Sequence, residues 1–184
     1  SKRSVPYLNF LSKEIKELVV VTTKPKKSGR GNKIRTNPVE NFCQNNNIIF
    51  KYFDDSEIYS DMDYGVCVSF GAIFKADFIN GNAPIFNIHL SRLPELRGPS
   101  PIETAILNGN TLFGYTIFKI VQEIDEGPIL YQNDVEVLDN YSSNVYEALL
   151  EDFIKNYKSI DFKSQLEIQE GTVSVTSKFL KSDY

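Results

Sequence analysis

The chain has 184 residues, of which 41% are hydrophobic and 24% are charged, and its formal net charge is −4. This length suits one domain with a substantial core. No apolar run approaches the ~20 residues that a membrane helix needs, and no sustained apolar stretch follows the first four residues as in a signal peptide. We therefore expect one globular domain and no membrane partner.

Apolar runs in chain order predict buried strands. They cover residues 18–22, 48–53, 64–70 and 85–88, and two further strands are expected at 113–121 and 129–137. Helix signals lie between them. Residues 38–45 follow Asn37 as N-cap, and residues 101–107 end at Asn108 and Gly109. Residues 142–157 form the longest helix, with one apolar face made of Val145, Leu149, Phe153 and Ile154.

This alternation of strands and helices predicts an α/β fold with a mostly parallel sheet flanked by helices. Ligands of such sheets bind beyond the carboxyl ends of the strands. Gly71 and His89 both lie at such ends. From residue 163 onward the chain is polar and weakly patterned, with residues 172–176 as a possible short strand. We interpret that end as a tail or linker.

Basic residues are concentrated in one stretch. Residues 18–39 contain no acidic residue, and the remainder of the chain carries 14 cations against 24 acidic residues. The six cations of the stretch are Lys24, Lys26, Lys27, Arg30, Lys33 and Arg35. A basic loop on an acidic body indicates a local anionic partner rather than a general nucleic-acid-binding surface.

Cys43 and Cys67 have no partner cysteine or second histidine at metal-ligand spacing. Two reduced thiols in a core are more common than a disulfide or a metal site. The sequence therefore predicts no metal and favours a reducing compartment.

The only histidine, His89, stands in a chemically suggestive setting. Asn87 precedes it by two residues, so both side chains share a face of an extended segment. Asp125 follows 36 positions later in a turn before Gly127. A lone histidine is usually structural, and the asparagine and aspartate alone would suit a cap and a turn. Together they supply an amide donor, an imidazole and a carboxylate for transfer of an acyl or formyl group to an amine.

With these residues the chain resembles the catalytic domain of the methionyl-tRNA formyltransferases, within the wider group of 10-formyltetrahydrofolate-dependent transferases. The hallmark asparagine, histidine and aspartate of the family match Asn87, His89 and Asp125. Its Ser-Leu-Leu-Pro folate segment matches residues 91–94, with Arg92 at the first leucine. Residues 69–74, 97–102, 114–117 and 124–130 also fit, and the early basic stretch is similar to its tRNA-inserting loop.

The resemblance implies a Rossmann-like formyltransferase fold whose glycine-containing first strand is missing. Residues 1–160 would be an N-terminally truncated catalytic domain, and residues 161–184 a polar tail or linker toward an absent C-terminal domain. The implied catalytic residues are Asn87, His89 and Asp125. The implied folate-binding residues are Phe70, Gly71, Ala72, Ile73, Phe74, Ser91, Arg92, Leu93, Pro94, Gln122, Glu123 and Ile124.

The implied reaction transfers a formyl group from 10-formyltetrahydrofolate to the amine of methionyl-initiator tRNA, without a metal. The tRNA contacts would be Lys24, Lys26, Lys27, Arg30, Lys33 and Arg35. A monomer is expected, in the mitochondrial matrix or the bacterial cytoplasm. Two alternatives stay open: the same chemistry on a nucleotide, a sugar amine or water, and a non-catalytic fragment that binds folate or RNA.

Overall fold

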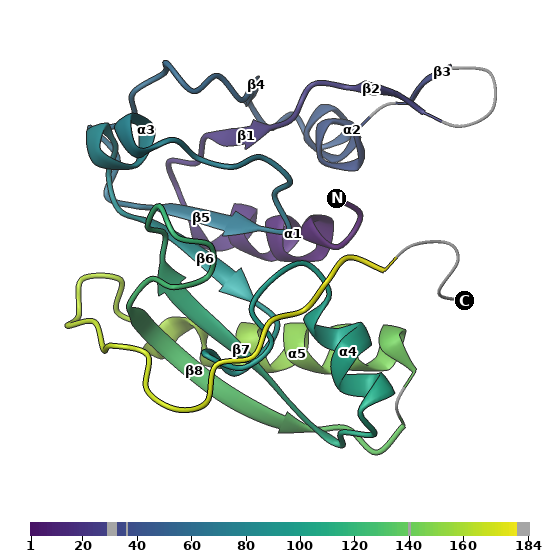
Figure 1. The fold of residues 1–184 in the computed structure, drawn as a ribbon. Helices are drawn as coiled ribbons and strands as arrows, with labels where there is room; N and C mark the ends of the chain where they lie inside the picture. Colours follow the sequence, from purple (N-terminus) through teal and green to yellow (C-terminus); the bar gives the residue numbers. More distant parts are fainter. Residues whose placement is uncertain (29–32, 36, 140, 180–184) are drawn as a thin grey trace.

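The structure, a computed structural model, describes residues 1–28, 33–35, 37–139 and 141–179. Strands and helices alternate through most of the chain (Figure 1). The elements are α1 (Ser4–Glu14), β1 (Val20–Thr22), β2 (Lys26–Ser28), β3 (Lys33–Arg35), α2 (Pro38–Asn45), β4 (Phe50–Tyr52), β5 (Gly65–Val68), α3 (Ala76–Gly81), β6 (Ile85–His89), α4 (Pro101–Leu107), β7 (Leu112–Lys119), β8 (Ile129–Glu136) and α5 (Ser142–Asn156), followed by a short 3₁₀ turn (Tyr157–Ser159).

Among the strands that form the body of the molecule, β1, β4, β5 and β6 make parallel pairs, whereas β7 and β8 are added in antiparallel fashion. β1 pairs in parallel with β4, and β5 in parallel with β6. β7 and β8 extend the sheet from β6 in the order β5-β6-β7-β8, each antiparallel to its neighbour. A pocket of about 480 Å³, lined by both β1 and β5, lies between the two sheets. The α/β class expected from the sequence is confirmed.

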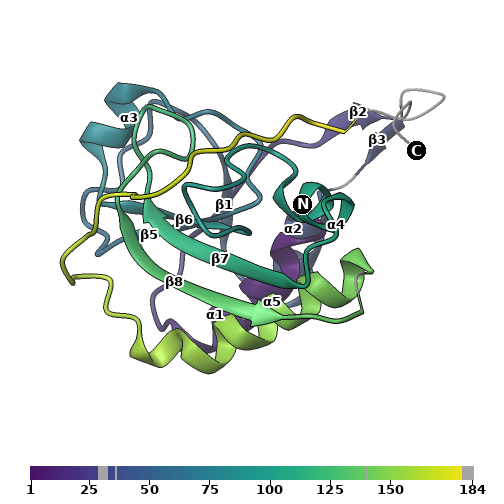
Figure 2. The same ribbon diagram turned by 60° about the horizontal axis from the view of Figure 1, so that its bottom comes forward.

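Helices α1 and α5 cover one face of the four-stranded sheet (Figure 2). On α5 the predicted face is confirmed for Val145, Leu149 and Phe153, which are fully buried. Ile154 was predicted on the same face but is 37% exposed, because one residue along a helix turns the side chain by about 100°. The Phe153 ring lies 5.3 Å from that of Tyr7 on α1, which ties the two helices together.

The sequence did not predict α3 or the β2–β3 hairpin. The hairpin pairs Lys26 with Arg35 and Ser28 with Lys33 across its two strands, and Figures 1 and 2 show it extending away from the body of the molecule. Four of the six predicted cations, Lys26, Lys27, Lys33 and Arg35, therefore lie on an antiparallel ribbon. Arg30, at the centre of that prediction, lies outside the described residues.

The polar C-terminal segment runs back over the first 160 residues, alongside the loop that follows β6 (Figures 1 and 2). Isolated β-bridges join Glu167 to Ile129 and Val175 to Arg97. Thr176 is only 6% exposed. In the region expected to contain a short strand, one bridge forms. The segment that the sequence presents as a tail is thus packed against the loops at the strand ends.

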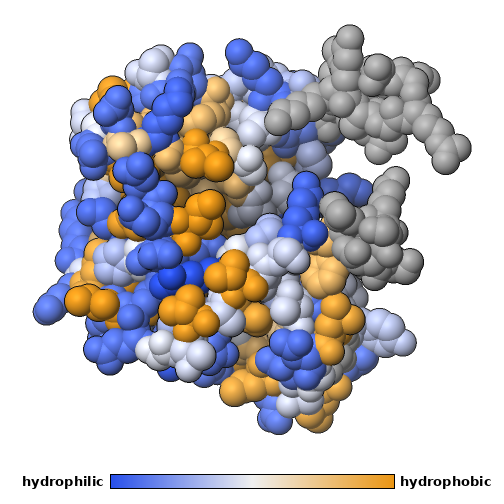
Figure 3. Space-filling model, viewed as in Figure 1, coloured by the Kyte–Doolittle hydropathy of each residue, from blue (hydrophilic) through white to orange (hydrophobic). Residues whose placement is uncertain are grey.

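The surface seen in Figure 3 is hollowed near its middle, and apolar side chains border the hollow. Ile73 and Ile124 are 77% and 65% exposed and belong to the walls of a pocket described below. In the described part of the chain, no helix is long and apolar enough to cross a membrane.

Candidate active site

A pocket of about 670 Å³ opens beyond the carboxyl ends of β5 and β6. This is the position at which open α/β sheets bind ligands. Its walls come from Cys67 on β5 and residues 69–74 after it, from Asn87, His89 and Leu90 at the end of β6, and from Phe118 on β7 and residues 120–125 after it. Ser1, Arg3, Gly98, Pro99, Pro101 and Tyr146 contribute the remainder of the lining. The volume is within the usual range for small-molecule sites.

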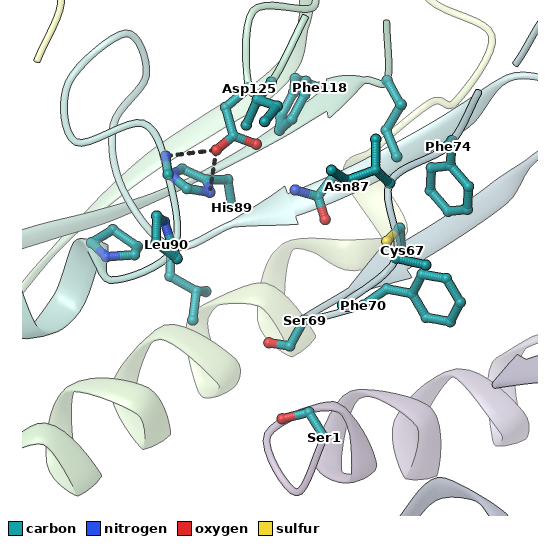
Figure 4. Close-up of a pocket in the computed structure, with 18 of the residues that line it drawn as sticks. Ser1, Cys67, Ser69, Phe70, Phe74, Asn87, His89, Leu90, Phe118 and Asp125 are labelled. Carbon is teal, nitrogen blue, oxygen red and sulfur yellow. Dashed lines mark hydrogen bonds and ion pairs between the residues drawn. The ribbon is translucent and has the colours of Figure 1, made fainter. Parts of the chain in front are cut away.

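Asn87 and His89 alternate along β6 and both line this pocket (Figure 4). β6 pairs with β5 on one side and with β7 on the other, and Asn87 stands opposite Cys67 and Phe118, so the direction of the strand is fixed. Among the residues that the structure describes, none hydrogen-bonds the Asn87 amide. A donor that faces a pocket without a protein partner is available to a ligand.

The His89 imidazole is held at both nitrogens. Its Nε2 lies 2.9 Å from the carbonyl oxygen of Leu96, and its Nδ1 lies 3.7 Å from Oδ2 of Asp125. A carbonyl oxygen only accepts, so Nε2 carries a proton and donates it to Leu96. Nδ1 is therefore the nitrogen through which this 7% exposed ring shares a proton with Asp125 or with a bound molecule.

The Asp125 carboxylate is fixed by its own loop. Oδ2 accepts a hydrogen bond of 2.7 Å from the backbone N–H of Gly98, and the side chain is only 13% exposed. Asp125 itself has φ 56°, a strained value for a non-glycine residue. Two residues later, a Cβ on Gly127 would stand 1.7 Å from the carbonyl oxygen of Lys119. Only glycine permits this close approach, which anchors the loop to β7.

The predicted contact between His89 and Asp125 is confirmed. Both lie on the same side of the sheet, and Figure 4 shows the carboxylate directed at the imidazole and at the Gly98 amide. An amide donor, a proton-sharing imidazole and a carboxylate now surround one cavity. This set of groups can stabilise an oxyanion and move a proton during acyl transfer.

The predicted folate-binding residues divide into two sets. The first lines the pocket: Phe70, Gly71, Ala72, Ile73, Phe74, Gln122, Glu123 and Ile124. The rings of Phe70 and Phe74 stack at 5.6 Å with an interplanar angle of 10°, so part of the pocket wall is aromatic. Such a wall suits a planar ring system.

The second set, Ser91, Arg92, Leu93 and Pro94, is absent from the pocket walls. Leu93 is 2% exposed, and its N–H donates to the buried Thr116 hydroxyl. The Ser91 hydroxyl donates to the Glu95 carbonyl at 2.6 Å. Arg92 turns to Asp134 on β8 and pairs with it at 2.9 Å. This segment shapes the turn after His89 through its bonds to Glu95 and to the neighbouring strands β7 and β8.

Several wall residues were not predicted from the sequence. Phe118 faces the cavity because β7 pairs it with Asn87, and a register argument from the two strands could have found it. Cys67 and Leu90 adjoin predicted residues. Burial raises the pKa of the Cys67 thiol to about 12, so this thiol is protonated at neutral pH and is no nucleophile.

The basic residues are only partly described. Lys24 is exposed. Lys26, Lys27, Lys33 and Arg35 lie on β2 and β3, where the backbone alone is described, and Arg30 lies outside the described residues. In the ranges that the structure covers, no three His, Cys, Asp or Glu residues come together as a metal site would require.

Comparison with known proteins identifies a family and several relatives of this chain. The family model described as "Formyl transferase" matches residues 8–157. A methionyl-tRNA formyltransferase of Thermosipho africanus is 34% identical over 96% of this chain and 62% of its own length. One of Mycoplasma pneumoniae is 38% identical over 67% of this chain and 42% of its own length. The chain thus spans less than two thirds of the curated relatives it matches.

Solved structures share the fold. WlaRD, a sugar 3N-formyl transferase solved in the presence of dTDP and 5-N-formyl-THF, matches with a TM-score of 0.72 and 25% identity over 99% of this chain and 67% of its own. An N-formyltransferase of Helicobacter canadensis matches with a TM-score of 0.71 and 22% identity over 99% and 68%. These likenesses confirm the expected Rossmann-like formyltransferase fold.

Proposed function

The chain belongs to the formyl transferase family, and from that premise we propose that it transfers a formyl group from 10-formyltetrahydrofolate to the amine of methionyl-initiator tRNA. The observation that carries the proposal is the convergence of Asn87, His89 and Asp125 on one pocket. Relatives named for this reaction match the chain along 96% of its length, which supports the choice of acceptor.

In the proposed reaction a carbon–nitrogen bond forms to the acceptor amine, and the bond from the formyl carbon to the donor nitrogen breaks. Attack of the amine places negative charge on the formyl oxygen. The unpartnered Asn87 amide donates to that oxygen. His89 and Asp125 share the proton that the amine gives up and return it toward the donor nitrogen, through Nδ1, the ring nitrogen not bonded to Leu96.

The donor is a substrate, and the pocket residues fit it. Phe70 and Phe74 offer an aromatic wall for the pterin ring, and Gln122, Glu123 and Ile124 form another part of the lining. Polar recognition comes from main-chain groups of these segments. Fixed placement of donor and acceptor in such a slot contributes several orders of magnitude to the rate.

Two candidates exist for the acceptor of the formyl group. The β2–β3 hairpin carries four cations on its two strands and extends from the body, which favours an anionic partner such as the acceptor stem of a tRNA. A sugar amine is the second candidate, because WlaRD, a sugar 3N-formyl transferase, matches 99% of the chain. The named relatives are bacterial, so we place the reaction in the bacterial cytoplasm.

Acceptor competition tests the proposal. The rate of formyl transfer from 10-formyltetrahydrofolate is measured with methionyl-tRNA, a dTDP-linked amino sugar and water as acceptors under identical conditions. The highest kcat/KM is expected for methionyl-tRNA. A higher value for the amino sugar would replace the acceptor but keep the chemistry. Donor binding without turnover on any acceptor would favour the non-catalytic alternative.

A further inference from the structure

Residues 167–176, here called the clamp segment, contact the two loops that hold the reacting groups. We propose that this segment keeps two loops in their reactive arrangement: residues 90–100, which follow His89, and residues 120–128, which contain Asp125. Gln169 and Thr176 are the positioning residues. The inference rests on the proposed function for its activity readout. No residue of the clamp segment lines the pocket, so each acts through the residues of another segment.

Gln169 joins the two loops through one side-chain amide. Its Oε1 accepts hydrogen bonds from Nε and Nη2 of Arg97, at 3.2 and 2.8 Å. Its Nε2 donates to the carbonyl oxygens of Asp125 and Gly127, at 2.9 and 2.8 Å. All four bonds are intramolecular. The amide therefore fixes the backbone of the catalytic carboxylate relative to the loop that follows His89.

The clamp segment also holds Leu96, whose carbonyl oxygen accepts the His89 Nε2 proton. Leu96 has φ 55°, a conformation that non-glycine residues adopt only under strain. Its N–H donates to the Ser174 hydroxyl at 2.8 Å, and the adjacent Arg97 N–H donates to the Ser174 carbonyl at 2.9 Å. These bonds keep the Leu96 carbonyl directed at the imidazole.

Thr176, two residues after Ser174, adds further hydrogen bonds to the loop after β6. Its N–H donates to the Arg97 carbonyl at 2.7 Å. Its hydroxyl accepts from the Ser100 N–H at 3.1 Å and donates to the same Arg97 carbonyl at 3.0 Å. Thr176 is buried, so replacement of its hydroxyl by a methyl group would leave the Ser100 N–H without its acceptor, while the Arg97 carbonyl would keep only the bond from the Thr176 N–H.

Gly98 shows how closely the clamp segment approaches the site. A Cβ on Gly98 would lie 2.7 Å from the Thr176 carbonyl oxygen, and the residue has φ 104°. Only glycine fits here. The N–H of this same residue donates to the Asp125 carboxylate. Gly98 therefore contacts the clamp segment and, through its N–H, also holds the Asp125 carboxylate.

Three variants and a control separate positioning from simple stability. Thr176→Val keeps the side-chain shape and removes the hydroxyl, whereas Thr176→Ser restores it. Gln169→Glu keeps the acceptor for Arg97 and loses the N–H donors to Asp125 and Gly127. Glu170→Ala removes an exposed neighbour in the same segment. We expect kcat to fall about 10- to 100-fold in Thr176→Val and Gln169→Glu, with the KM of the folate donor within about threefold of wild type. Thr176→Ser and Glu170→Ala should retain nearly full activity.

The ring ¹⁵N resonances of His89 give a readout that needs no turnover. His89 is the only histidine of the chain, so its signals need no further assignment. In Thr176→Val and Gln169→Glu they should move away from the Nε2–H pattern, and in Glu170→Ala they should not. Thermal unfolding of each variant verifies that it is folded, and Gln169→Glu, which keeps the size of the side chain, serves if Thr176→Val does not fold.

The ring signals and the kinetics distinguish failure of the positioning role from failure of the proposed function. If the wild-type protein formylates no tRNA but the ring signals move as expected, the positioning role stands and the acceptor assignment is lost. If folded Thr176→Val and Gln169→Glu keep wild-type ring signals and kcat, the positioning role is overturned. Equal impairment of Thr176→Ser and Thr176→Val would overturn the role of the hydroxyl.

Discussion

Replacement of Asp125 by asparagine isolates the charge of the catalytic carboxylate. Asparagine has nearly the same size, and its side-chain oxygen can still accept the Gly98 N–H that Oδ2 accepts at 2.7 Å. What disappears is the negative charge 3.7 Å from Nδ1 of His89. Two unit charges at that separation interact by about 4.5 kcal/mol at an effective dielectric constant of about 20. Because the Asp125 side chain is 13% exposed, solvent removes only part of this energy.

Since a tenfold change in rate corresponds to about 1.4 kcal/mol, Asp125→Asn should lower kcat by about 10²- to 10³-fold. The KM of the folate donor should change little, because the aromatic wall proposed to contact the donor's ring is formed by other residues of the pocket, Phe70 and Phe74. The assay is steady-state formyl transfer to methionyl-tRNA, with thermal unfolding as a check on the fold. Glu136→Gln removes an exposed carboxylate on β8 and is the matched control. A folded Asp125→Asn enzyme with kcat within threefold of wild type would refute the catalytic assignment.

Three further predictions use other parts of the chain. His89→Ala should reduce kcat by about 10²- to 10³-fold or more in a protein that stays folded by circular dichroism, and a near-normal kcat would contradict its role. Arg30→Ala should raise the KM for methionyl-tRNA and make its salt dependence shallower by about one unit, with the donor KM unchanged; an unchanged salt slope would favour a small acceptor. Burial raises the pKa of Cys67 from 9.0 to about 12, so the unfolded chain ionises first as the pH rises. The stability from this thiol is complete below about pH 9 and lost between pH 9 and 12, and urea unfolding should show a weaker decline in Cys67→Ala than in wild type.

Local signals in the sequence were sufficient for most of the fold. Asn37 was predicted as an N-cap, and its side chain accepts from the Val39 N–H at 2.9 Å. Apolar β-branched runs marked β1, β5 and β6, because strands buried in a sheet need such residues on both faces. α3 has only six residues, too few for a periodic pattern to stand out, and the β2–β3 hairpin has no apolar alternation to reveal it.

The candidate site was predictable to the extent that it depends on strand geometry. Two residues on one strand share a face, so Asn87 and His89 could be paired from their spacing alone. Asp125 was singled out by its turn before Gly127 and then matched by the resemblance, and the structure places its carboxylate 3.7 Å from His89. Residues 91–94 were assigned from a motif. A motif specifies which residues occur but not which way they turn, and here Arg92 turns outward to Asp134.

The C-terminal segment shows where reasoning from local sequence stops. Gln169 and Thr176 lie 72 and 79 residues from Arg97 along the chain, and nothing in their neighbours indicates a buried partner. Their contacts are hydrogen bonds of polar side chains and of the backbone, which leave no pattern of apolar residues. A polar, aperiodic stretch therefore fits two very different structures, a solvated linker and a segment that covers polar loops. The glycine at position 98 is the one trace of this contact in the sequence, since its need for φ 104° and for space beside Thr176 follows only from the packed segment.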